Sequence, residues 1–240
     1  MVLQPLSYQV GGANFTGFVA DGSGGRTVPG VLVAHEGGGY LNNHPKERAE
    51  MLAGLGYIAF ALDLFGDPRP TLDEARAIVQ QLRSDLPTLR ARVKAALDLL
   101  KQQPNVDPGR TAAVGFCFGG TAVLELARSG ADVACIVGFH AGLTTSAPDD
   151  AHAIRGKVLV CQGNKDPIIT AEQRDAFAAE MTRAGVDWQM HLYGGVGHSF
   201  TNRDIDAWNI PGFAYHAAAD QRSWRAMRDL FNEVFQPPNA

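Results

Sequence analysis

The sequence predicts a single α/β domain, residues 1–240, with a mostly parallel central sheet, helices on both faces and a short β-hairpin at its start. Two observations support this fold class. Apolar runs of strand length alternate with segments of helical periodicity at the spacing of βαβ units. No repeat, low-complexity tract or linker divides the chain. A chain of this length can bury roughly 70% of the surface that its unfolded form exposes, which is enough for one large core.

The first half of the chain predicts a hairpin, two buried strands and a long helical segment. Its elements are hairpin strands at 8–10 and 15–20, strands at 29–35 and 57–62 with a helix from about 45 to 55 between them, and helical periodicity from 71 to 103. The two later strands are apolar throughout rather than alternating, which is typical of strands buried on both faces. Pro87 is expected to break or kink the long segment, and Leu89, Val93 and Leu100 recur on one helical face beyond it.

The second half continues the alternation of strand and helix. Its elements are a strand at 111–114 leading into a helix at 121–127, strands at 133–139, 157–161 and 188–193, a helix at 171–184, and a last helix at about 213–235. Gly185 is suited to end the helix before it, because glycine readily adopts the left-handed conformation found there. Trp224, Met227 and Phe231 lie on one stripe of the last helix, which is typical of a helix packed against a sheet.

Composition indicates an ordinary globular enzyme and excludes several classes of partner. The net charge is −4 and no run of lysine and arginine exceeds two residues, which argues against nucleic acid or an anionic membrane. The N-terminus lacks a secretory pattern and no apolar run reaches the length of a membrane span, so we expect a cytoplasmic protein. Cys117, Cys135 and Cys161 show no CxxC spacing, so we expect no disulfide framework, zinc site or other cofactor.

Residues 115–120, Gly-Phe-Cys-Phe-Gly-Gly, join a predicted strand to a predicted helix. A nucleophilic residue at a sharp strand-to-helix turn, with glycines two places before and after it, is the pattern of a nucleophile elbow. The glycines let neighbouring backbone approach a residue held in a strained conformation, where a side chain would collide. The pattern alone is equally compatible with Cys117 as a small core residue, so residues elsewhere in the chain must decide.

Two further polar residues follow strands of the predicted sheet. Asp166 comes after the strand at 157–161, and His198 comes after the strand at 188–193. Sites in open α/β sheets collect at the carboxyl ends of the strands. Either residue by itself is compatible with an ordinary turn or an exposed loop. The order nucleophile, acid, histidine is nevertheless that of the α/β-hydrolase triad, and we predict that Cys117, Asp166 and His198 form one.

The chain resembles the dienelactone hydrolase family of the α/β-hydrolase superfamily. The resemblance covers almost the whole chain and is clearest at His35-Glu36-Gly37, at residues 115–120, at Gly163-Asn164-Lys165-Asp166 and at Gly197-His198-Ser199-Phe200. It implies the α/β-hydrolase fold, with Cys117 as nucleophile, His198 as base and then acid, and Asp166 as the group that orients His198. Glu36 matches the family's glutamate, which lies beside the resting cysteine and moves when substrate binds.

These assignments predict a metal-free hydrolase of small carboxylic esters or lactones that acts through an acyl thioester. The N–H of Phe118 is expected to bind the tetrahedral oxyanion, together with that of Gly37 or a neighbour. A helix N-terminus and a histidine favour the thiolate of Cys117, whereas a carboxylate at Glu36 opposes it. We therefore expect Glu36 to keep the thiol protonated until substrate displaces it; a salt-bridged carboxylate at the rim is the alternative for this residue.

The family also holds a substrate carboxylate with two arginines. Arg69 and Arg203 are the candidates here, although the spacing of Arg203 from His198 is not a clean match, which puts a muconolactone-type substrate in doubt. His140 follows a strand and is expected either to line the pocket or to serve the structure. Trp208, in the segment 201–212, is expected to shape an apolar pocket wall, with a loop over the sheet or a dimer contact as the alternative.

Two alternatives to ester hydrolysis remain open at this point. The same thiolate could attack activated phosphotriesters, because a phosphoryl oxygen gains negative charge much as a carbonyl does. Cys117 could instead be a redox-sensing thiol on a scaffold without hydrolytic activity. A hydrolase fold used only for binding is disfavoured, since no triad member is missing. We expect a small-molecule substrate and a monomer or homodimer.

Overall fold

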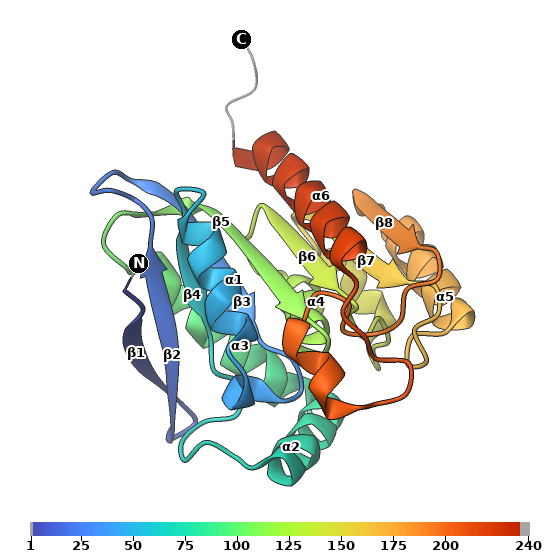
Figure 1. Ribbon diagram of the computed structural model, residues 1–240. Helices are drawn as coiled ribbons and strands as arrows, with labels where there is room; N and C mark the ends of the chain where they lie inside the picture. The colour runs from blue at the N-terminus through green and yellow to red at the C-terminus, as the bar shows by residue number, and fades with distance from the viewer. Residues whose placement is uncertain (1, 236–240) are drawn as a thin grey trace.

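The computed structural model describes residues 2–235, which form one eight-stranded sheet between two layers of helices (Figure 1). The strand order is β1-β2-β4-β3-β5-β6-β7-β8. The strands are β1 (Gln4–Val10), β2 (Ala13–Asp21), β3 (Val28–Ala34), β4 (Ile58–Ala61), β5 (Val106–Phe116), β6 (Cys135–Phe139), β7 (Lys157–Gly163) and β8 (Trp188–Tyr193). The pairs β1–β2 and β2–β4 are antiparallel, and every other pair is parallel, as the sequence predicts.

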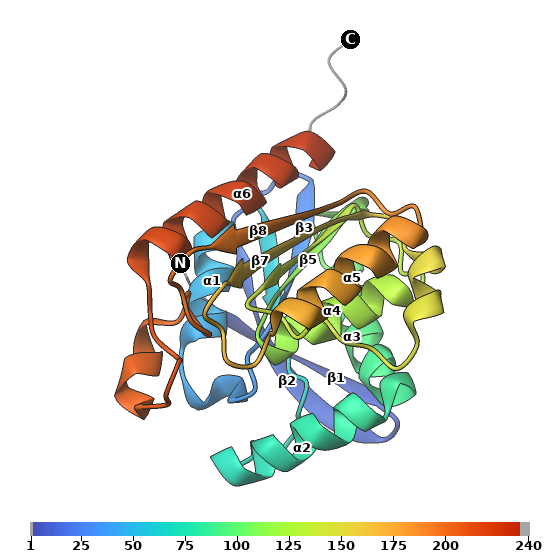
Figure 2. The same ribbon diagram turned by 90° about the vertical axis from the view of Figure 1, so that its right-hand side faces the viewer.

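Helices cover both faces of this sheet. The helices within residues 2–235 are α1 (His44–Ala53), α2 (Leu72–Ser84), α3 (Leu86–Lys101), α4 (Phe118–Arg128), α5 (Ala171–Arg183) and α6 (Ala217–Phe235), with short 3-10 helices η1 (Gly39–Leu41), η2 (Pro148–Ala153) and η3 (Arg203–Trp208). Figure 2 shows α1 and α6 on one face and α3, α4 and α5 on the other. Within the same residues, no helix has the length and apolar character needed to cross a lipid bilayer.

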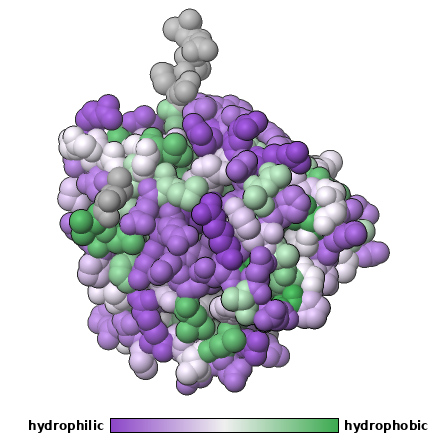
Figure 3. Space-filling model, viewed as in Figure 1, coloured by the Kyte–Doolittle hydropathy of each residue, from purple (hydrophilic) through white to green (hydrophobic). Residues whose placement is uncertain are grey.

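The central strands are buried on both faces, which accounts for their unbroken apolar runs. Every residue of β3 is buried. Leu32 packs into the cluster formed with α3, α4 and α5, whereas Val31 and Val33 pack into the cluster formed with α1 and α6. Successive side chains of a strand point to opposite faces, so a strand covered on both sides must be apolar at each position. Correspondingly, the outer face seen in Figure 3 is mainly hydrophilic, with its apolar groups in separate patches.

Several element boundaries differ from the sequence prediction; β5, for example, runs from Val106 to Phe116 rather than over 111–114. The predicted break near Pro87 is present, and both its exact position and the start of the last helix have identifiable causes. The long helical segment breaks at Asp85, two residues before Pro87, because Asp85 leaves the helical conformation and its carboxylate accepts the Thr88 N–H at 3.1 Å as the cap of α3. Pro87 then occupies the first turn of α3, where the missing N–H costs nothing. The last helix begins at Ala217 rather than near residue 213, since Phe213 instead forms a β-bridge with His198.

Candidate active site

Cys117 occupies a sharp turn between β5 and α4. Its backbone has φ 52° and ψ −114°, a conformation that residues other than glycine rarely adopt. A Cβ at Gly115 would lie 2.1 Å from the carbonyl oxygen of Gly119, and a Cβ at Gly119 would lie 2.2 Å from that of Ala34. Both collisions are with backbone, which cannot give way. The glycines are therefore required by the elbow, as the sequence predicts.

Asp166 and His198 lie together at the carboxyl ends of β7 and β8. His198 Nδ1 is 2.6 Å from Asp166 Oδ2. The other oxygen, Oδ1, accepts the N–H groups of Ile168 at 2.8 Å and Ile169 at 3.1 Å. Because both carboxylate oxygens have fixed partners, Asp166 holds the imidazole in one orientation with Nδ1 as the proton donor.

His198 carries a proton more readily than an ordinary histidine. Burial lowers the pKa of His198, but the negative charge of Cys117 and the hydrogen bond with Asp166 outweigh burial and raise the pKa from 6.5 to about 10. His198 Nε2 is outside hydrogen-bonding geometry with any described residue, so we attribute the effect of Cys117 to its charge. The site therefore favours the imidazolium form of His198.

Glu36 follows β3 and is only 7% exposed. Its Oε2 accepts a hydrogen bond from Asn202 Nδ2, and its Oε1 has no hydrogen-bond partner among the described residues and lies 3.9 Å from His140 Nε2. Burial raises the pKa of Glu36, against the opposing hydrogen bond from Asn202 and the charge of His198. No lysine or arginine of residues 2–235 is within ion-pair distance of this carboxyl group, so the salt-bridged alternative is not supported.

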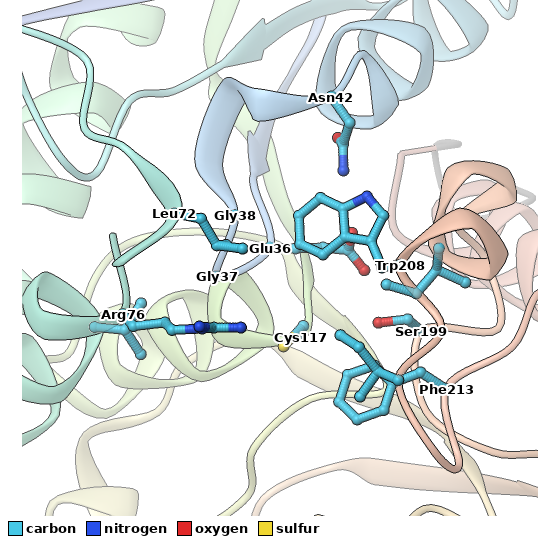
Figure 4. Close-up of a pocket in the computed structure, with 13 residues that line it drawn as sticks. Glu36, Gly37, Gly38, Asn42, Leu72, Arg76, Cys117, Ser199, Trp208 and Phe213 are labelled. Atoms are coloured by element: carbon cyan, nitrogen blue, oxygen red, sulfur yellow. The ribbon is translucent and has the colours of Figure 1, made fainter. Parts of the chain in front are cut away.

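A cavity of about 350 Å³ opens in front of the nucleophile (Figure 4). Cys117, Glu36 and Gly37 line it together with Trp208, so these four predicted residues meet at one place. The remaining lining residues are Gly38, Asn42, Leu72, Arg76, Val79, Ser199, Ile205, Ile210 and Phe213. Figure 4 shows Leu72 and Arg76 on one side of Cys117 and Trp208 and Phe213 on the other. The segment 201–212 thus forms an apolar wall of the cavity.

Three predicted substrate-binding residues lie outside this cavity. The guanidinium of Arg69 stacks over the Tyr40 ring at 4.4 Å, away from Cys117. Arg203 stacks over the Tyr215 ring at 5.7 Å and borders a different surface hollow. His140 is fully buried behind the nucleophile, where its Nδ1 accepts the Cys117 N–H at 3.1 Å. Their positions do not support contact with a substrate held at Cys117.

Among the site residues that the sequence did not predict, two polar ones bear on the chemistry. Arg76 lines the cavity from α2, and Asn202 holds Glu36. The start of α2 is readable in the sequence, because Thr71 and Glu74 form a capping box. That signal places Arg76 on a helix but does not say what the helix faces. No sequence pattern points to Asn202.

The family model described as "Dienelactone hydrolase family" matches residues 15–235. The chain belongs to this family. It is 48% identical to a solved structure named m3DLH, with a TM-score of 0.93 over 98% of this chain and 99% of that one. It is 42% identical, with the same TM-score and coverage, to the crystal structure of a dienelactone hydrolase-like promiscuous phosphotriesterase from metagenomic libraries. A carboxymethylenebutenolidase of a Pseudomonas species is 29% identical over 184 residues, 72% of this chain and 74% of that protein.

These matches confirm the predicted family and the α/β-hydrolase fold. The chain is a dienelactone hydrolase-like hydrolase.

Proposed function

We propose that this hydrolase cleaves small esters and lactones with a Cys117–His198–Asp166 triad, through an acyl thioester. One observation carries the proposal: Cys117 lies at a strained elbow and lines a cavity, while His198, oriented by Asp166 at 2.6 Å, has a pKa raised by the charge of Cys117. A thiolate stabilised by an imidazolium is the attacking species of cysteine hydrolases.

In the first half of the reaction, the Cys117 thiolate attacks the carbonyl carbon and the carbonyl π electrons move to oxygen. Phe118 is in the first turn of α4, where its N–H has no intrahelical acceptor, and its side chain is buried in the core. Its N–H is therefore available to bind the oxyanion, and the N–H of Gly37, which also lines the cavity, is the second candidate donor. Collapse of the tetrahedral intermediate breaks the ester C–O bond, and the His198 imidazolium gives its Nε2 proton to the leaving alkoxide.

In the second half, His198 is neutral and its Nε2 accepts a proton from water as that water attacks the thioester carbon. The same oxyanion site stabilises the second tetrahedral intermediate. Its collapse expels the Cys117 thiolate and releases the carboxylic acid, and the proton on His198 restores the starting pair. Asp166 keeps Nδ1 protonated through both halves, so Nε2 is the nitrogen that exchanges protons.

The cavity wall favours uncharged substrates with apolar or aromatic groups. Its sides are formed by leucine, valine, isoleucine, tryptophan and phenylalanine side chains. Arg76 is the one cationic side chain among the described lining residues, and its guanidinium pairs with Asp73 at 3.0 Å. A substrate with two carboxylates would leave its charges poorly matched here, whereas an aryl ester or a lactone would bury apolar surface.

A second activity, on activated phosphotriesters, has support of its own. The dienelactone hydrolase-like protein that is 42% identical to this chain is a promiscuous phosphotriesterase. A neutral triester matches the apolar wall, and its phosphoryl oxygen would occupy the oxyanion site. Release of nitrophenol from a dialkyl nitrophenyl phosphate tests this activity. Equal release by wild type and Cys117→Ala would exclude the proposed site as its source.

The proposed function is tested most directly by intact mass spectrometry after brief exposure to a panel of esters, lactones and phosphotriesters. We expect an adduct of the acyl or phosphoryl mass on Cys117 and on no other residue. If no compound of the panel gives an adduct or turnover, while peroxide converts Cys117 to a sulfenate, the protein is a redox sensor and the hydrolytic proposal is wrong.

Replacing Glu36 by glutamine is expected to speed the reaction of iodoacetamide with Cys117 in the absence of substrate. The change removes a negative charge that opposes the thiolate and keeps an oxygen able to accept the hydrogen bond from Asn202. The pseudo-first-order alkylation rate, measured against pH, should reach its half-maximum at a lower pH in the variant. Identical profiles would show that Glu36 does not control the protonation of the thiol.

A further inference from the structure

Behind the nucleophile, a buried chain of hydrogen bonds runs from the backbone of Cys117 to α1. The Cys117 N–H donates to His140 Nδ1 at 3.1 Å, and His140 Nε2 lies 2.8 Å from the hydroxyl oxygen of Thr201. The same hydroxyl lies 3.2 Å from His44 Nε2, which also accepts the Nε–H of Arg48 at 3.2 Å. The four side chains are at most 4% exposed. The ester-hydrolysis scheme above uses none of them.

The two ends of the chain determine the direction of each hydrogen bond. A backbone N–H and a guanidinium N–H can only donate, so His140 Nδ1 and His44 Nε2 must both accept. A ring nitrogen that accepts carries no proton. Both imidazoles are therefore neutral, with the proton on Nε2 in His140 and on Nδ1 in His44. It follows that the Thr201 hydroxyl accepts from His140 and donates to His44.

The surroundings favour the neutral form of both rings, and the Nδ1–H that the assignment gives to His44 has no hydrogen-bond partner within residues 2–235. Burial lowers the pKa of His140 well below its usual value, and the positive charges of His198 and Arg48 act in the same direction. Glu36 faces His140 from the loop after β3, but the separation of 3.9 Å is too long for a hydrogen bond that would hold a second proton. Burial likewise lowers the pKa of His44 well below its usual value, and the positive charge of Arg48 lowers it further.

The far end of the chain is anchored to the C-terminal helix. Arg48 Nη2 lies 2.8 Å from Asp220 Oδ1, and it also donates to the carbonyl oxygen of Thr201. Asp220 belongs to the first turn of α6. The guanidinium is thus held by two acceptors on different elements, so its Nε–H cannot turn away from His44. The ion pair between α1 and α6 therefore fixes the direction of the hydrogen bonds that run from Cys117 to Arg48.

We propose that Thr201 and His140 are positioning residues of the active site: the Thr201 hydroxyl locks His140 in the neutral Nε2–H tautomer, and His140 then holds the backbone amide of Cys117. This inference rests on the proposed role of Cys117 as the nucleophile. The other tautomer would point the Nδ1–H of His140 at the Cys117 N–H, two donors facing each other. An imidazolium there would do the same and would also repel His198, whose ring centroid is 5.1 Å away.

The orientation matters because Cys117 has a strained backbone. Its N–H is shared between His140 Nδ1 and the carbonyl oxygen of Phe139 at 3.0 Å, and both acceptors come from the end of β6. Two acceptors from one rigid strand hold the peptide at φ 52° and so aim Sγ into the cavity. Since every hydrogen bond of the chain has a fixed direction, the chain holds the nucleophile and does not conduct protons.

The wild-type protein provides the first test, which needs no substrate. In ¹⁵N-histidine NMR spectra, His140 should show the Nε2–H tautomer and should not titrate between about pH 6 and pH 9. An Nδ1–H tautomer, or a titration within that range, would overturn the proposal. This measurement does not depend on ester turnover, so a wrong tautomer assignment can be told apart from a failure of the proposed hydrolytic function.

Thr201→Val provides the second test, because valine keeps the shape of threonine and removes the hydroxyl. We expect His140 to lose its single tautomer and kcat for an aryl ester to fall about tenfold or more, with KM changed less than about threefold. Thr201→Ser should restore both the tautomer and most of kcat. Thr182→Val, on the exposed side of α5, is the matched control for loss of a hydroxyl.

A Thr201→Val variant that keeps the wild-type tautomer and kcat would contradict the proposal. If this variant does not fold, the Thr201→Ser variant and the wild-type NMR spectrum still test the proposal. A serine variant with normal thermal unfolding but a mixed tautomer would also contradict it.

Discussion

Replacing Cys117 by alanine is expected to reduce kcat/KM for an activated aryl ester by roughly 10⁴-fold or more. The variant keeps the elbow, the cavity and the His198–Asp166 pair but has no nucleophile, so an acyl intermediate cannot form. Initial rates of nitrophenyl acetate hydrolysis measure the effect, corrected for the uncatalysed rate. Circular dichroism should show an intact fold, because alanine differs from cysteine only by the loss of the sulfur atom and introduces no new contact.

Cys135→Ala and Cys161→Ala are the matched controls. Both side chains are fully buried in strands, and burial raises the pKa of Cys135 and raises that of Cys161 to about 12. Neither thiol lines the cavity. We expect these variants to retain turnover and a single iodoacetamide label. Loss of activity in the controls with retention in Cys117→Ala would refute the assignment of the nucleophile.

The parts of this protein that follow from local chemistry could be predicted from the sequence. The runs at β3 and β4 are apolar because both faces are covered, and the elbow glycines are fixed by backbone collisions. The last apolar residues mark where β7 and β8 end, so the sequence alone places Asp166 and His198 at one edge of the sheet. Each of these signals lies within about ten residues of the feature that it predicts.

The parts that depend on how loops return to the sheet could not be predicted. Arg69 and Arg76 are close in sequence, but Arg69 stacks on Tyr40, whereas Arg76 projects into the cavity from α2. Only Ala75 and Leu82 of α2 are buried, so its helical pattern carries little information about what it faces. His140 shows the same limit: a strand-end histidine can point into a pocket or behind it, and the choice depends on partners from distant elements.

Asp166→Asn is expected to lower kcat by roughly 10³- to 10⁴-fold while leaving the fold in place. The N–H groups of Ile168 and Ile169 both donate to Oδ1, so the asparagine oxygen should take that position. Its amide nitrogen then faces His198 Nδ1, and an amide nitrogen can only donate. Nδ1 must accept, and the proton of a neutral His198 moves to Nε2. In that tautomer Nε2 cannot take a proton from water, so the second half of the reaction stops.

The same variant should also change how His198 titrates. The hydrogen bond and the charge of Asp166 both raise the pKa of His198, which is about 10 in the wild type. A raised pKa keeps the imidazolium at neutral pH, and removing the two contributions lowers the pKa, so the proton is lost at a lower pH. NMR titration of His198 measures this shift. Less imidazolium means less thiolate stabilisation, and alkylation of Cys117 at neutral pH should slow.

Asp187→Asn is the matched control, because Asp187 pairs with Lys157 on the surface. Exposed ion pairs contribute little to stability, so this variant should keep wild-type kcat and the wild-type titration of His198. The two readouts separate the possible roles of Asp166. A large fall in kcat with an unchanged His198 pKa would mean that Asp166 acts only by supporting the loop at Ile168. Joint loss of kcat and of the raised pKa requires that the carboxylate itself orient and charge the histidine, which is the role a cysteine hydrolase needs from the third member of its triad.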